Sequence, residues 1–419
     1  AAADVAASLP ELPRYSVDLA LSPRERWSAA LHDFLALRGV APFLDFYTAV
    51  LDEMKLADAD VFSFYSENLL AFEKAYAELH ADALGEMRAL AEALQAHCRG
   101  EECPLLSWPR VFLAQLHMQI QNVGPKLGEC TSVVVRQPNG SIVHVRNWDF
   151  GPSPDALGSA STTVDFTGMD GSRFTCLLAL THITKWTTCL RPGAFSLSLN
   201  ARGFGEGHER GRSPAEELRL LQLGRLPRTE VLRRVMVEPT FGAALAAAAA
   251  SRPLTSMYII LADGAPPSGS SSGSMGGAVV TLEGDGRSSD VWPMPLRGET
   301  EDDWFLVQTN VDHWLRMAQN ATSSHRREHV RARLRALGPE AAASGTLLEM
   351  LQDKEVYPKG NEGPDDGRIF RPSTIASVVM RPSDGTFEPF LWRALPQRPA
   401  GMPAPSVSAR GPVLRAMYM

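Results

Sequence analysis

A single cysteine stands at the start of a stretch that has the pattern of a β-hairpin. The segment from Lys126 to Phe150 is KLGECTSVVVRQPNGSIVHVRNWDF, with Cys130 opening one apolar run and Asp149 closing the next. Asn-Gly between two β-rich runs is a strong hairpin signal. A thiol and a carboxylate at the open end of one hairpin could supply a nucleophile and a partner for its base. Alternatively, Cys130 is a buried filler, because free cysteine packs as a small hydrophobic residue.

The turn chemistry predicts which side chains share a face. A two-residue turn at Asn-Gly, or a four-residue loop over Pro138–Ser141, pairs Cys130 with Asp149. Arg146 then falls on the opposite face, because side chains alternate along a strand. We therefore expect the Asp149 carboxylate to face Cys130, and Arg146 to reach it only through a bulge.

Composition and motifs exclude several function classes. The net charge of −7 does not indicate a nucleic-acid binder, and no apolar run approaches the length of a membrane span. The sequence contains no GxxxxGK[ST], HExxH or CxxC pair, so we predict no cofactor and no metal site. Hydrophobic residues at 44% and charged residues at 21% are typical of a globular chain with an ordinary core.

The elements that must position the hairpin differ in kind along the chain. Helical periodicity dominates residues 1–129, including a long stretch from Ser66 to His97. From Cys130 onward the period changes to two, over many short strands with a few helices between them. This order predicts an α+β class, with residues 1–129 as a helical region, 130–393 as a strand-rich domain and 394–419 as a Pro-rich tail. The apolar helix faces are expected to be core, with transient membrane-surface contact as the alternative.

Five cysteines do not make a disulfide framework. Cys98 and Cys103 are close enough in sequence for a small bridged loop, or they are two free thiols near a helix end.

The hairpin resembles the nucleophile hairpin of the acid ceramidase and N-acylethanolamine acid amidase family. Further segments resemble that family in the same order: LRPGAFSLSLNAR (Leu190–Arg202), MYIILADG (Met257–Gly264) and WFLVQTNVDHW (Trp304–Trp314), with the first closer to the ceramidases. The resemblance implies an αββα N-terminal-nucleophile sandwich that cuts itself before the cysteine and hydrolyses lipid amides. It also implies a lysosomal or other endomembrane lumen, whereas a chain that never carried a signal peptide would be cytoplasmic.

The resemblance also assigns roles to individual residues. Cys130 is the expected nucleophile, and its freed α-amine the base held by Asp149. Arg146 matches an active-site arginine, and Asn310 matches an asparagine that stabilises the oxyanion. Arg326 matches a further arginine, although Arg327 fits nearly as well.

Three departures from the family pattern favour a second hypothesis. Ala201 stands where the family has a glutamate, which would leave the adjacent Arg202 unpaired unless Glu206 or Glu209 substitutes. The segment His182–Lys185 replaces a glycine-containing stretch, which would narrow the pocket; an inward Lys185 would instead favour an anionic head group. The third is Glu129, which precedes the scissile bond where the family usually has an apolar residue.

The departures leave three function hypotheses. The first is an amidase of ceramide or related lipid amides. The second is an impaired homologue that serves a protein assembly, and the weakest is hydrolysis of non-lipid amides such as bile salts or penicillins.

Overall fold

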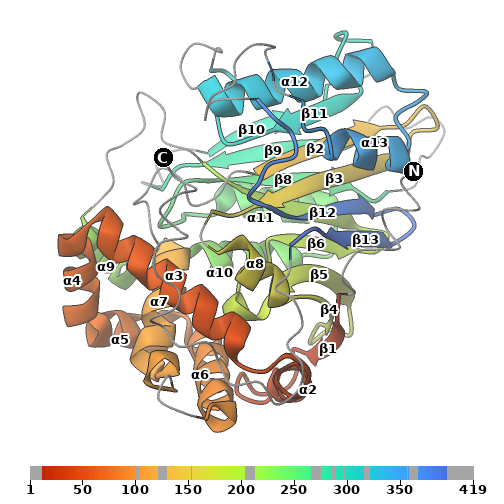
Figure 1. The fold of residues 1–419 in the computed structure, drawn as a ribbon. Helices are drawn as coiled ribbons and strands as arrows, with labels where there is room; N and C mark the ends of the chain where they lie inside the picture. The colour runs from red at the N-terminus through yellow and green to blue at the C-terminus, as the bar shows by residue number, and fades with distance from the viewer. Residues whose placement is uncertain are drawn as a thin grey trace.

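The computed structural model describes residues 12–99, 103–120, 130–151, 153–202, 213–265, 275–284, 289–295, 298–315, 321–355, 357 and 367–393. Glu206, Glu209, Glu129 and the predicted tail lie outside the described residues. The described part contains two β-sheets and two groups of helices (Figure 1). The α+β class predicted from the periodicity is confirmed.

The first sheet has eight strands in the order β1-β4-β5-β6-β7-β8-β9-β10. Their bounds are β1 Arg14–Asp18, β4 Ser161–Thr167, β5 Arg173–Ala179, β6 Thr188–Arg191, β7 Phe195–Ala201, β8 Met257–Asp263, β9 Gly277–Leu282 and β10 Ser289–Pro293. The second sheet has five strands in the order β11-β2-β3-β12-β13. Their bounds are β2 Cys130–Arg136, β3 Ile142–Asp149, β11 Phe305–Gln308, β12 Thr374–Arg381 and β13 Thr386–Leu391.

The helices fall into two groups in sequence, one before β2 and one after β3. Their bounds are α2 Ser28–Arg38, α3 Ala41–Ala57, α4 Ala59–Glu67, α5 Leu69–Leu79, α6 Ala81–His97, the short 3-10 helix η1 Cys103–Leu106 and α7 Trp108–Ile120. The later ones are α8 Pro154–Ser159, the 3-10 helix η2 Leu180–His182, α9 Pro214–Gln222, α10 Arg228–Met236, α11 Phe241–Ala250, α12 Ala321–Leu337 and α13 Ser344–Leu351. The long helix expected from Ser66 to His97 is divided at His80 into α5 and α6.

The helical region also contributes one strand that the periodicity missed. β1 pairs in parallel with β4, with Tyr15 opposite Val164. Five residues with only two apolar side chains give a weak strand signal, so tertiary pairing decides this segment. The strand ties the start of the described chain to the edge of the eight-stranded sheet.

The layers follow from which faces are apolar. Val133 and Val135 on β2 pack outward against α12 and α13, whereas Val134 on the same strand packs against β8 and β9 of the other sheet. Alternate residues of one buried strand therefore serve two different cores. On the far side, Ala244 and Ala248 of α11 cover the eight-stranded sheet, beside the helices α2–α7 (Figure 1). This order is the αββα sandwich that the resemblance implied.

The hairpin register predicted from the turn is wrong. β2 and β3 pair Cys130 with Trp148 and Ser132 with Arg146, not Cys130 with Asp149. The Gln137 amide bonds to the Ser141 carbonyl, and the Gly140 amide to the Gln137 carbonyl, so the loop between them has three residues. Gly140 has φ +88°, the left-handed conformation with which such a loop ends. An odd loop length shifts the pairing by one residue and exchanges the faces of Arg146 and Asp149.

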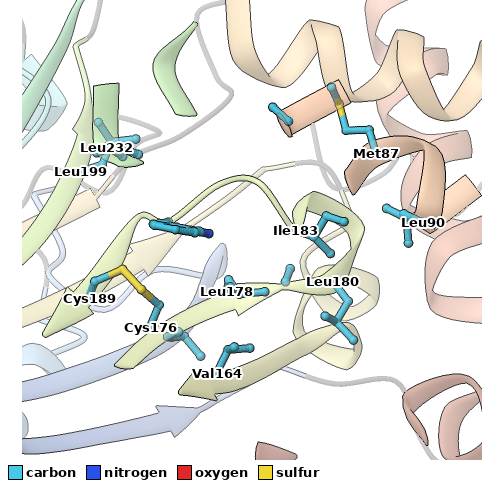
Figure 2. Packing of buried hydrophobic residues seen from close by; sticks show 14 of the residues in the cluster. Met87, Leu90, Val164, Cys176, Leu178, Leu180, Ile183, Cys189, Leu199 and Leu232 are labelled. Atoms are coloured by element: carbon cyan, nitrogen blue, oxygen red, sulfur yellow. A yellow bond between two sulfur atoms is a disulfide. The ribbon is translucent and has the colours of Figure 1, made fainter. Parts of the chain in front are cut away.

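Two disulfides are present in the described residues. Cys98–Cys103 closes the small loop that the sequence allowed. Cys176–Cys189, which the sequence analysis did not predict, joins β5 to β6 (Figure 2). In the same core cluster, Met87 and Leu90 of α6 lie near Leu180 and Ile183, so the helical region packs where β5 ends. Cys130 remains as the free cysteine of the described chain.

Within the described residues, no single helix has the length and apolar content to cross a membrane. The consecutive helices α2 and α3 reach that length and composition only together, and they are bent by 97° at their junction.

Candidate active site

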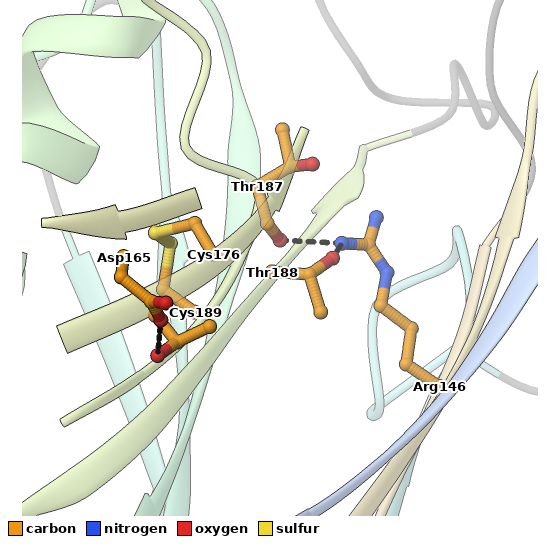
Figure 3. The surroundings of a disulfide bond; sticks show 7 residues. Arg146, Asp165, Cys176, Thr187, Thr188 and Cys189 are labelled. Atoms are coloured by element: carbon orange, nitrogen blue, oxygen red, sulfur yellow. Dashed lines mark hydrogen bonds between the residues drawn. A yellow bond between two sulfur atoms is a disulfide. The ribbon is translucent and has the colours of Figure 1, made fainter. Parts of the chain in front are cut away.

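Cys130 and Arg146 lie on one face of the hairpin and touch. Arg146 Nη2 donates to Cys130 Sγ at 3.2 Å, and both residues are buried. The guanidinium is held from the other side by the Thr187 carbonyl and the Thr188 hydroxyl, beside the β5–β6 disulfide (Figure 3). A cation fixed against the sulfur stabilises negative charge there. The structure thus places Arg146 where the register argument had excluded it.

Asn310 contacts the backbone nitrogen of the nucleophile. Its Oδ1 accepts from Cys130 N at 2.9 Å and from Arg326 Nη2 at 2.6 Å. Because both neighbours are donors, the orientation of the amide is fixed. Its Nδ2 donates to the Ala201 carbonyl at 2.7 Å. For the oxyanion role implied by the resemblance, that bond to Ala201 would have to open.

Asp149 lies at the site but on the other face of β3. Its Oδ1 accepts from the Thr374 hydroxyl at 2.6 Å, and its Oδ2 lies 3.6 Å from Arg326 Nη1. Only its backbone carbonyl approaches Cys130, at 4.0 Å from Sγ. The expected direct contact between the carboxylate and Cys130 is replaced by a chain that runs from Asp149 through Arg326 and Asn310 to Cys130 N.

The two adjacent arginines at 326 and 327 point to different places. Arg326, fully buried, faces Asp149 and Asn310. Arg327 instead donates to the carbonyls of Asp312 and Leu315.

Arg202 is paired, contrary to the expectation from Ala201. Its Nε and Nη2 donate to the two Asp312 oxygens at 2.7 and 2.8 Å, and its Nη1 lies 2.5 Å from Glu283. Burial alone would lower the pKa of Arg202, because it disfavours the charged guanidinium. The carboxylates of Asp312 and Glu283 have the larger combined effect and raise that pKa. Asp312 also accepts from Tyr258. The lost glutamate is compensated by carboxylates from two other segments, which no local pattern could reveal.

A polar row between the sheets was missed by the sequence analysis. Ser132 donates to Asn200 Oδ1 at 2.8 Å, and Asn200 Nδ2 reaches the carbonyls of Gln308 and Cys130 at 2.8 and 3.4 Å. Ser198 bonds to Ser132 and to His144. The alternation SLSLN at residues 196–200 was the available signal, since it puts three polar side chains on one inward face. Asn200 ties the start of β2 to the end of β11.

A group of basic side chains lies on the helical side of Cys130. Burial lowers the pKa of Lys185 to about 7. The positive charges of Arg228 and Arg146 add to this effect, and the charge of Cys130 opposes it. Burial likewise lowers the pKa of Arg228 to about 10, and Cys130 opposes this. His117 and His182 are buried, and burial plus the Lys185 charge lowers the pKa of both. Four basic groups, from α7, α10, η2 and the segment that follows η2, thus interact with one another beside the nucleophile.

One group could hold a metal ion among the described residues. His329, Asp353 and Glu355 bring their ligand atoms within 4.8 Å of one another. Arg333 Nε already lies 3.2 Å from Asp353 Oδ2. The arginine therefore neutralises the carboxylate that a metal ion would need as a ligand.

The chain is similar to N-acylethanolamine-hydrolyzing acid amidases. It is 28% identical to the rat enzyme over 230 residues, which cover 54% of this chain and 57% of that protein, and 29% identical to the rabbit enzyme over 54% and 58%. The chain thus spans somewhat over half the length of these curated relatives. No family model matches. A solved structure of the Caenorhabditis elegans ortholog of N-acylethanolamine-hydrolyzing acid amidase aligns with this chain with a TM-score of 0.45 and 24% sequence identity. The alignment covers 61% of this chain and 93% of that one.

Proposed function

We propose that this chain is an amidase that hydrolyses N-acyl lipid amides through Cys130. The observation that carries the proposal is the double contact of the nucleophile, with Arg146 at 3.2 Å from Sγ and Asn310 at 2.9 Å from N. The names of the relatives point to N-acylethanolamines, and the segment at Leu190–Arg202 keeps ceramide as a second lipid amide to test.

The chemistry would proceed by acyl transfer. Cleavage before Cys130 would free its α-amine, which is ordinarily basic near pH 8 and can take the thiol proton. The sulfur would attack the amide carbon, and the departing amine would take that proton as the C–N bond breaks. Water would then cleave the C–S bond of the thioester and release the fatty acid. Asn310 would keep the amine directed at the substrate, and Arg326 and Asp149 would keep Asn310 in place.

The alternative of a catalytically impaired homologue is not favoured. One of its two supports was an unpaired arginine at 202, and Asp312 and Glu283 supply the missing charge. The other is the segment His182–Lys185, whose effect on turnover the assay below measures.

An oxidising, acidic lumen is the compartment we propose. Two disulfides in the described chain are typical of secreted or endomembrane proteins, and rare in the cytosol.

The test is hydrolysis of N-palmitoylethanolamine and of a ceramide at pH 5, with release of palmitate measured for the wild type and for Cys130→Ala. We expect turnover by the wild type and none by the variant. Equal release by both proteins would assign the reaction to another group, and no release by the wild type with either lipid would contradict the proposal.

A further inference from the structure

The described chain holds two basic side chains beside Cys130 whose charge no carboxylate compensates. Lys185 and Arg228 form no ion pair among the residues the structure describes, and Arg228 Nε has no hydrogen-bond partner there. The ammonium group of Lys185 lies 5.9 Å from the centre of the Phe150 ring. Phe150 directly follows Asp149, whose carbonyl is 4.0 Å from Cys130 Sγ. Lys185 is therefore close to the place where an amide must be attacked, and Arg228 interacts electrostatically with both Lys185 and Cys130.

Leaving such cations unpaired is unfavourable for a folded protein. A buried charge without a partner costs several kcal/mol, and proteins usually pair it or remove it. Elsewhere in this chain that rule holds: Arg233, also buried, pairs with Glu86. Lys185 and Arg228 both keep part of their surface accessible although protein surrounds them, so a ligand group can reach them. This combination is typical of a site for an anion rather than of a structural ion pair.

The two nearby histidines do not supply the missing negative charge. The ring nitrogens of His117 and Nε2 of His182 have no hydrogen-bond partner in the described chain, and His182 packs its ring edge against Phe46 at 4.7 Å. The groups that face Lys185 are thus basic or aromatic. The negative charge that acts on both cations is that of the Cys130 sulfur, so no carboxylate of the described chain competes with an arriving anion.

We propose that Lys185 and Arg228 bind an anionic group carried by the amide substrate, a carboxylate or a phosphate on the amine side of the scissile bond. The inference rests on the proposed amidase function and names its substrate class. In an N-acyl amino acid the carboxylate is separated from the amide nitrogen by one carbon, so it would be held close to the bond that is attacked. Lys185 and Arg228 are specificity-determining residues in this account, and they take no part in bond breaking.

The test compares three amides with the same palmitoyl chain: N-palmitoylglycine, N-palmitoyl-phosphoethanolamine and N-palmitoylethanolamine. The readout is the ratio of kcat/KM for each anionic amide to that for the neutral one. We expect the wild type to prefer an anionic amide, and Lys185→Met and Arg228→Met each to lower that ratio about ten- to hundredfold, as for loss of one charged hydrogen bond. The arm with the higher ratio identifies carboxylate or phosphate as the group bound.

Lys354→Met is the matched control, because Lys354 also lies over a phenylalanine ring, Phe370 at 5.2 Å, but is exposed and far along the chain from Cys130. Its ratio should equal that of the wild type. A wild type that prefers the neutral amide would overturn the inference and leave the amidase proposal standing. So would variants that lose activity equally on all three amides, since Lys185 would then act on the reaction itself.

Binding separates the two proposals if the wild type hydrolyses none of the amides. In Cys130→Ala, calorimetric titration should show tighter binding of an anionic amide than of the ethanolamide, and the added Lys185→Met change should remove the difference. Absence of that preference would overturn the inference independently of turnover.

Discussion

Two groups of cations flank Cys130, one buried and one half-buried, and they differ in how their charge is compensated. On the side of α12, Arg202 is held by Asp312 and Glu283, and Arg326 by Asp149 and Asn310. On the side of α7 and α10, Lys185 and Arg228 have no carboxylate partner among the described residues. The first group therefore acts as a structural frame that fixes the nucleophile. The second is left for a ligand.

The largest effect on stability should come from breaking the paired group. Asp312→Leu removes the carboxylate that holds Arg202 through two hydrogen bonds and accepts from Tyr258. Removing one partner of a buried pair typically costs about 3–5 kcal/mol. Urea unfolding should show a loss of this size in the free energy of unfolding. A loss below about 1 kcal/mol would mean that Arg202 does not depend on Asp312.

Asn310 connects the paired group to Cys130, and two substitutions separate its possible roles. Asn310→Leu should lower kcat about 10²–10³-fold, the usual loss for a polar group at a reacting centre. Asn310→Asp keeps an acceptor for Cys130 N and Arg326 Nη2, so it should lose less than about tenfold if the residue positions the nucleophile. Equal losses in the two variants would indicate that the side-chain NH₂, and hence the oxyanion, is what matters.

Removing a cation from the uncompensated group should stabilise the protein, and the effect should depend on pH. The pKa of Lys185 falls from 10.5 to about 7 on folding. Below pH 7 the lysine is protonated in both states, and the buried charge is fully present. As the pH rises through 7 the folded protein releases this proton while the unfolded chain keeps it, so wild-type stability rises toward pH 10.

Lys185→Met should therefore be more stable than the wild type at pH 5, by at least about 1–2 kcal/mol, and this advantage should shrink or reverse by pH 9. Thermal unfolding at the two pH values measures this. A difference that grows with pH would have the wrong sign for a buried, uncompensated lysine.

The smallest effect is expected from an ion pair near the surface. Asp302 bonds to Arg331 and Arg335, both partly exposed. Asp302→Asn should cost less than about 1 kcal/mol, because water screens such pairs. It is the control for Asp312→Leu, and a loss as large as that of the buried variant would remove the distinction between them.

The sequence predicted the layers better than the contacts. The change from helical periodicity to a period of two at Cys130 was sufficient for the α+β class, because each pattern depends on neighbours along the chain, and the resemblance then implied the sandwich. The register depended on one loop residue: Asn139-Gly140 signals a turn, but whether the loop has two or three residues depends on Gly140 and Ser141 in the folded hairpin. That one-residue difference reversed the faces of Arg146 and Asp149.

The candidate residues were found through resemblance, whereas their partners were not. Asp312, Glu283 and Thr374 reach the site from segments far apart in sequence, and nothing local indicates that they meet. Lys185 was noticed as a departure from a glycine-containing pattern, but its proximity to Arg228 and Cys130 depends on how α10 packs on α7.

The central claim, that Cys130 becomes an N-terminal nucleophile, is tested most directly by the mass and N-terminal sequence of the protein after incubation at pH 4.5–5. The account predicts a fragment that begins at Cys130 in the wild type, appearing together with amide hydrolysis, and an uncut chain in Cys130→Ala. A wild-type chain that hydrolyses N-acyl lipids while it remains uncut before Cys130 would contradict the claim, because the proposed α-amine base would then not exist.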